Sequence, residues 1–121
     1  MELLSKSASE LASMLVKKEI SSVELTKAQL DNIDKLNPKI NSYLTVTHEL
    51  ALSQAKQVDD QRAKGESLPA LAGVPIAVKD NLTTIGIETT AGSKILKGWV
   101  PPYNATVVEK ILANRMPILG K

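Results

Sequence analysis

The residue of this sequence that is best placed to do chemistry is Lys79, which lies in the apolar run LAGVPIAVKDN over 71–81. A run of about 4–8 apolar residues that begins near a turn former such as Pro75 is typical of a buried strand. A lysine in such a strand is costly unless it is paired or has a function. Burial disfavours the ammonium form, so Lys79 could accept a proton there, although by pattern alone a solvated lysine is commoner. Asp80 could orient Lys79, but a structural role at the strand end is favoured.

The composition excludes several other kinds of site. The absence of cysteine rules out a disulfide, a thiol nucleophile and a cysteine metal site. His48 is the single histidine, so we expect no metal site and a surface residue at the start of a helix. A net charge of +2 is too balanced to indicate a polyanion partner, and 2% aromatic residues argue against base stacking. Gly120 and Lys121 resemble the end of a phosphate-binding loop, but Arg115 replaces a glycine that such a loop requires.

The first half of the chain has the periodicity of helices. Ser7 and Ser21 each precede a glutamate by three residues, and this capping box marks the start of a helix. Pro38 is expected to end the second helix, since the residue before a proline avoids helical geometry. The segments predicted in this way are helices over 8–18, 22–36 and 48–64 and a strand-like, β-rich stretch over 40–47. Together they make a helical segment over 1–65.

A strand–helix–strand unit is expected in the second half, with strands over 74–79 and 116–119 and a helix over 105–114. Asn104 is expected to cap this helix, and Asn114 to end it in the left-handed conformation. Strands that are joined by such a crossover are expected to be parallel. Two strands are too little sheet to stand alone, so residues 66–121 are predicted to be the start of an incomplete α/β core.

The last predicted strand has two features that bear on its pairing. Pro117 lies inside it and removes one backbone donor from the ladder. The chain also stops directly after this strand, which would leave a sheet edge open. We therefore expect residues 1–121 alone to be poorly soluble.

The segment over 83–93 is rich in glycine and threonine and has no helical period. Segments of this kind allow the backbone to approach another group closely and do not form a core. It could line a substrate pocket or serve as an ordinary connection. A brief turn of helix is expected after it, over 94–100.

Several blocks of the sequence, in the same order, resemble the amidase signature family. They are LAGVPIAVKDN over 71–81, TTAGSKIL over 89–96, WVPPYNATVV over 99–108 and ILGK over 118–121, with SSVELT over 21–26 and NPKINSYL over 37–44 nearer the start. The resemblance covers nearly the whole chain. It implies the α/β, mixed-sheet fold of that family in incomplete form, with N-terminal helices followed by the first strands and the crossover helix.

The resemblance also implies a serine hydrolase mechanism that uses two serines and one lysine. Lys79 matches the catalytic lysine, which takes the proton of the nucleophilic serine through a second serine held in a cis peptide. In the family both serines lie in a Gly-Ser-rich segment beyond the position of Lys121, and Ser93 matches a non-catalytic position. The chain alone is therefore expected to be inactive. The resemblance places 83–93 near the active site without assigning it a contact.

Within the family, the blocks are most similar to the branch that hydrolyses glutamine for tRNA-dependent amidation. This similarity implies glutamine as a substrate, partner subunits B and C, Glu-tRNA(Gln) as the acceptor, ATP and Mg²⁺ used by the complex, and a cytoplasmic location. No cofactor site is expected in this segment, and no apolar run approaches the roughly 18 residues of a membrane helix. Two alternatives stay open: a stand-alone amidase acting on small amides, or a non-catalytic binding protein that ends at Lys121.

Overall fold

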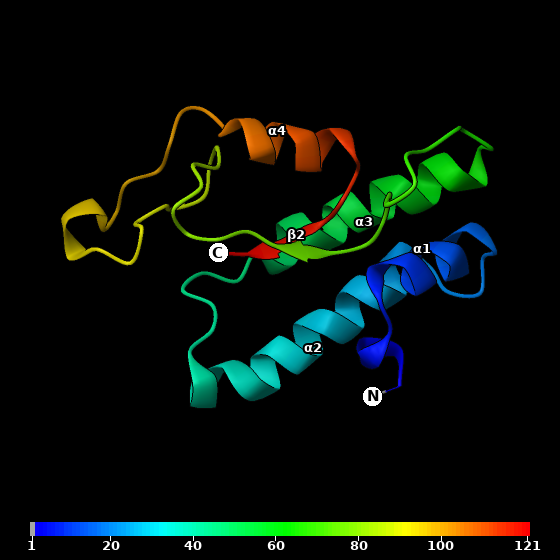
Figure 1. Ribbon diagram of the computed structural model, residues 1–121, viewed down its shortest axis with the longest axis horizontal. Coiled ribbons are helices and arrows are strands. Elements are labelled where there is room, and N and C mark those ends of the chain that lie inside the picture. Colours follow the sequence, from blue (N-terminus) through cyan, green and yellow to red (C-terminus); the bar gives the residue numbers. More distant parts are fainter. Residues whose placement is uncertain (1) are drawn as a thin grey trace.

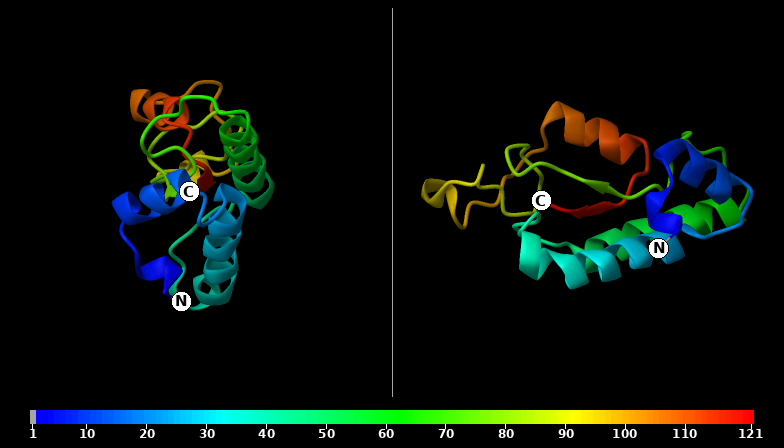
Figure 2. Two further views of the ribbon diagram at one scale, coloured as in Figure 1. Left: turned by 90° about the vertical axis from the view of Figure 1, so that its right-hand side faces the viewer. Right: turned by 60° about the horizontal axis from the view of Figure 1, so that its bottom comes forward.

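The computed structural model describes residues 2–121. Its elements, in chain order, are a 3₁₀ turn η1 (Leu3–Ser5), α1 (Ala8–Val16), α2 (Ser22–Ile40), α3 (His48–Ala63), β1 (Ile76–Ala77), a 3₁₀ turn η2 (Lys94–Leu96), α4 (Thr106–Ala113) and β2 (Ile118–Gly120). The short sheet lies between α4 on one side and the α2–α3 pair on the other (Figures 1 and 2). This order confirms the α/β expectation of N-terminal helices followed by strands and a crossover helix.

Both predicted capping boxes are present. The Ser7 hydroxyl accepts a hydrogen bond from the Glu10 amide, and the Glu10 carboxylate accepts one from the Ser7 amide. Ser21 and Glu24 make the same pair of bonds at the start of α2. Each box satisfies two backbone donors that the first turn of a helix would otherwise leave free.

The expectation that α2 ends before Pro38 is wrong, because the helix runs on to Ile40 with the proline inside it. A proline in the last turn removes a single donor, and two other features close the helix. Asn41 takes the left-handed conformation with φ 49°. The Asn37 side chain donates to the Tyr43 carbonyl and accepts from the Tyr43 amide, which fixes the chain as it leaves the helix.

The β-rich stretch over 40–47 is not a strand in the structure. It forms one isolated antiparallel bridge, Val46 with Gly120. The amides of Leu44 and Thr45 also donate to the Lys121 carbonyl, and the Lys121 amide donates to the Thr45 carbonyl. This pairing covers the edge of β2 that faces away from β1, so the open-edge argument for poor solubility does not apply to β2.

The two strands are parallel, as the crossover predicts, with Ile76 opposite Ile118 and Ala77 opposite Gly120. They are shorter than the expected 74–79 and 116–119. Pro117 has no amide hydrogen, so the ladder of β2 begins one residue later, while the Pro117 carbonyl accepts from the Ile76 amide.

The two ends of α4 differ from the expected ones. Asn104 does not cap the helix, because its carbonyl oxygen accepts from the Ile85 amide and its amide group donates to Glu109. At the other end the left-handed residue is Arg115, with φ 56°, rather than Asn114. The Asn114 side chain donates to the Lys110 carbonyl, and this bond keeps Asn114 at the C-cap of α4, so the left-handed turn comes one residue later, at Arg115.

Three apolar clusters form the core. They are Leu11, Leu15, Leu25 and Val74; Leu30, Ile33, Ala51 and Leu119; and Val78, Ile87, Val108 and Ile118. The first two clusters combine residues from 1–65 with residues from 66–121, so these two segments pack together. The third cluster joins Val78, the residue that precedes Lys79, to β2, to α4 and to the 83–93 loop.

Candidate active site around Lys79

Lys79 lies just past the carboxyl end of β1. The Val78 amide donates to the Gly120 carbonyl at 3.0 Å, and the Leu82 amide donates back to the Lys79 carbonyl at 3.0 Å, which closes a turn over 79–82. The carboxyl end of a parallel strand is where sites commonly form in α/β sheets. The backbone around Lys79 is therefore well defined from both sides.

The expectation of an apolar, buried setting for Lys79 is wrong in this chain, where its side chain is exposed. Successive side chains of an extended segment point to opposite faces. Ala77 and Lys79 are exposed, whereas Val78 between them is buried in the third core cluster. Lys79 instead lines an open hollow of about 520 Å³, together with Tyr43, Asp80 and Lys121 among others.

Asp80 has a structural role. Its carboxylate accepts hydrogen bonds from the amide and the hydroxyl of Thr90, at 3.0 and 2.6 Å, and its carbonyl accepts from the Ala91 amide. These bonds tie the Lys79 turn to the 83–93 loop. The geometry therefore favours the structural role of Asp80 over an orienting bond to Lys79.

Lys121 is the residue that the sequence reasoning missed. Its ammonium group is buried and donates to the Leu82 carbonyl and to the hydroxyls of Thr84 and Thr89. Burial lowers the pKa of Lys121 below its usual value, and the nearby Asp80 carboxylate partly raises this pKa again. A signal is present in the sequence, since Lys121 follows an apolar strand as Lys79 does.

The 83–93 loop does line a hollow. Thr90, Gly92 and Ser93 border a space of about 260 Å³ next to Asp80 and Glu88. The Ser93 hydroxyl accepts from the Ile95 amide and so begins the η2 turn. This bond gives Ser93 a structural role at the start of η2.

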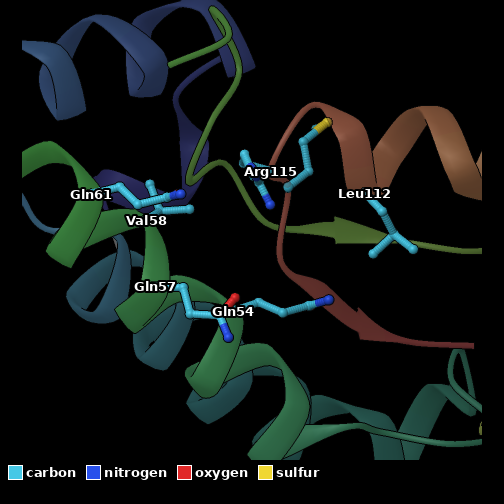
Figure 3. Close-up of a pocket in the computed structure, with 7 residues that line it drawn as sticks. Gln54, Gln57, Val58, Gln61, Leu112 and Arg115 are labelled. Carbon is cyan, nitrogen blue, oxygen red and sulfur yellow. The ribbon is translucent and has the colours of Figure 1, made fainter. Parts of the chain in front are cut away.

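Two other places in the structure have weaker claims to chemistry. His48 begins α3, is exposed, and contacts Asp34 through Nε2 at 2.9 Å, as expected of a surface residue. A cleft of about 130 Å³ lies between α3 and α4, lined by Gln54, Gln57, Gln61 and Arg115 among others (Figure 3). Amide and guanidinium groups offer neither a nucleophile nor a general base at neutral pH.

The sequence of this chain matches curated proteins over its full length. It is 54% identical over 124 residues to the A subunit of glutamyl-tRNA(Gln) amidotransferase of Paenarthrobacter aurescens, covering 99% of the chain and 24% of that protein. The protein of the same name from Carboxydothermus hydrogenoformans is 53% identical over 121 residues, covering 100% of the chain and 25% of that protein. The chain thus spans about a quarter of the length of these relatives.

Solved structures with the same fold, and a family model, agree with this match. A peptide amidase from Stenotrophomonas maltophilia superposes with a TM-score of 0.90 at 28% identity, covering 97% of this chain and 24% of that one. A bacterial aryl acylamidase of the amidase signature enzymes family gives 0.87 at 27% identity, covering 95% and 24%. The family model described as Amidase matches residues 24–121. The chain therefore belongs to the amidase family.

Proposed function

We propose that this chain is the N-terminal part of a glutamine-hydrolysing amidotransferase subunit, which supplies ammonia to convert Glu-tRNA(Gln) to Gln-tRNA(Gln). The observation that supports this proposal most is the identity of 54% and 53% to proteins named as such subunits. The aryl acylamidase and the peptide amidase compared above are only 27% and 28% identical. The protein would accordingly be a ligase of protein biosynthesis.

In this proposal Lys79 is the base of a Ser-cisSer-Lys triad, and both serines come from the part of the subunit beyond these residues. A serine hydroxyl attacks the glutamine amide carbonyl, and its proton passes through the second serine to the Lys79 amine. That proton then passes back to the amide nitrogen as the C–N bond breaks, so ammonia leaves, an acyl-enzyme forms and Lys79 is again neutral. Activation of a weak hydroxyl nucleophile by a nearby base is the general pattern of such chemistry.

The position of Lys79 supports this role. It lies at the carboxyl end of β1 and faces an open hollow of about 520 Å³. Because its side chain is exposed here, the desolvation that favours a neutral amine must come from residues outside this chain. The relatives are about four times as long, so they have chain available to cover the hollow.

The remaining parts of the proposal concern the complex. Subunits B and C would receive the ammonia, and ATP with Mg²⁺ would activate the glutamyl group there rather than in these residues. The location would be the cytoplasm. Among the described residues, none of the helices is long and apolar enough to cross a bilayer.

A stand-alone amidase of the same family is the alternative that the structural matches would allow. Purification of the full-length protein, with and without B and C, separates the two. We expect glutamine hydrolysis that depends on the partners and formation of Gln-tRNA(Gln) in their presence. Hydrolysis of small amides at full rate by the isolated protein, with no association with B and C, would contradict the proposal.

A further inference from the structure

Lys121 carries a buried charge for which the proposed chemistry has no use. The exposed fraction of its side chain is 0%. The ammonium donates to the Leu82 carbonyl at 2.6 Å, to Thr89 Oγ1 at 2.9 Å and to Thr84 Oγ1 at 3.0 Å. A lysine has three donors, and here each finds an oxygen.

Asp80 compensates this charge without a hydrogen bond to it. Its Oδ1 lies 3.8 Å from the Lys121 Nζ, and within residues 2–121 that oxygen is buried without a hydrogen-bond partner. The other oxygen of the carboxylate is occupied by Thr90. The charge pair therefore joins the end of β2 to both ends of the loop that follows Lys79.

The turn that contains Lys79 is held on both sides by residues 120–121. On one side the Gly120 carbonyl accepts from the Val78 amide. On the other side the Lys121 ammonium binds the Leu82 carbonyl, and Leu82 closes the turn onto Lys79. A rotation of the 79–82 turn would break one of these contacts.

Gly120 and Lys121, which hold the 79–82 turn, are themselves hydrogen-bonded to the segment between α2 and α3. The Lys121 amide and carbonyl pair with Thr45 and Leu44. Gly120 has φ 152°, and a Cβ at this position would overlap the Thr45 carbonyl oxygen. The backbone of 120–121 is therefore held closely in place, which makes it a firm base for the Lys79 turn.

We propose that Lys121 is a positioning residue, whose buried ammonium fixes the 79–82 turn so that Lys79 presents its amine in one geometry. This inference depends on the proposed role of Lys79 as the base. A displacement of about 1 Å in a catalytic group can cost about 10²-fold in rate. A purely structural Lys121 would instead lower stability and leave the turnover of folded enzyme unchanged.

The test is Lys121→Met in the full-length protein in complex with B and C. We expect kcat for glutamine hydrolysis to fall about 10²-fold with KM within about two-fold, because a positioning defect acts on the chemical step. Amide hydrogen exchange over 79–91 should become faster. Leu15→Ala is the matched control, since Leu15 is buried in the first core cluster among the helices and Val74. It should lower the melting temperature and leave kcat and the exchange of 79–91 unchanged.

A kcat close to that of the wild type, with unchanged exchange over 79–91, would overturn the inference. If Lys121→Met yields no folded protein, Thr84→Val and Thr89→Val each remove one acceptor of the ammonium and should each lower kcat. Wild-type kcat in both would equally overturn it. Lys79→Ala, measured alongside, separates the two proposals. If that variant is inactive while Lys121→Met keeps its kcat, the inference alone fails, whereas an active Lys79→Ala removes the proposed role of Lys79 as well.

Discussion

The substitution Asp80→Asn tests the buried charge pair with Lys121. Asparagine keeps the shape of the side chain and a carbonyl oxygen that can still accept from Thr90. It removes the negative charge that lies 3.8 Å from the Lys121 ammonium. The ammonium then stays buried with its hydrogen bonds but without a counter-charge.

The size of the effect follows from that distance. Two unit charges about 4 Å apart attract each other by about 4 kcal/mol at an effective dielectric constant of about 20. Loss of one partner of a buried pair typically costs about 3–5 kcal/mol. We expect the free energy of unfolding to fall by about 3 kcal/mol at pH 7, since Lys121 can shed its proton to limit the loss.

The pH dependence has a definite sign. Burial lowers the pKa of Lys121 in the folded state below 10.5, so the unfolded chain binds more protons between the folded-state pKa and 10.5. Stability therefore rises with pH across that window. The Asp80 carboxylate raises the pKa of Lys121, so in Asp80→Asn this pKa is lower and the rise of stability with pH begins at a lower pH. The deficit of Asp80→Asn relative to the wild type should shrink as the pH approaches 10.5.

Urea unfolding of the full-length protein, followed by circular dichroism at several pH values, measures both quantities. Asp31→Asn is the control, because Asp31 pairs with Lys27 on the exposed face of α2. The control should change stability by less than about 1 kcal/mol, as is usual for an exposed ion pair. A loss below about 1 kcal/mol for Asp80→Asn, or a deficit that does not change with pH, would refute the reasoning.

Two further substitutions test how the site is supported. Gly120→Ala should lower the equilibrium constant for folding at least several-fold, because the added Cβ overlaps the Thr45 carbonyl oxygen and the φ of 152° favours glycine. Urea unfolding measures this loss of stability, and an unchanged unfolding midpoint would contradict the prediction. Ser21→Ala should cost about 1 kcal/mol, because the capping box of α2 is lost, whereas Ser13→Ala within α1 should be nearly neutral; equal losses for the two would contradict the capping argument.

The starts of the helices could be predicted because a cap is a local signal. Ser7 and Ser21 lie three residues from their glutamate partners, so the sequence alone displays both. The end of α2 could not be predicted in this way. Pro38 suggested an earlier stop, but Asn41 in the left-handed conformation and the bonds between Asn37 and Tyr43 set the end instead.

The candidate site was predictable in place but not in environment. The apolar run correctly predicts that Lys79 lies at the end of a strand. Because the residues on both sides of Lys79 are apolar, the sequence does not indicate that Val78 is buried and Lys79 is exposed. The buried site of Lys121 could not be predicted from the sequence, because the three oxygens that accept from its ammonium lie 32 to 39 residues earlier in the chain. Only the parallel pairing of β1 with β2 brings them together.

The central claim is that Lys79 is the base for glutamine hydrolysis, and the most direct measurement is Lys79→Ala in the full-length protein in complex with B and C. Gln-tRNA(Gln) formation is measured with glutamine and, separately, with ammonium chloride as the nitrogen donor. Lys56→Ala, an exposed lysine on α3, serves as the control. We expect the glutamine-supported rate to fall at least about 10²-fold, as for loss of a general base, while the ammonium-supported rate is kept. A glutamine-supported rate within a few-fold of the wild type would contradict the account.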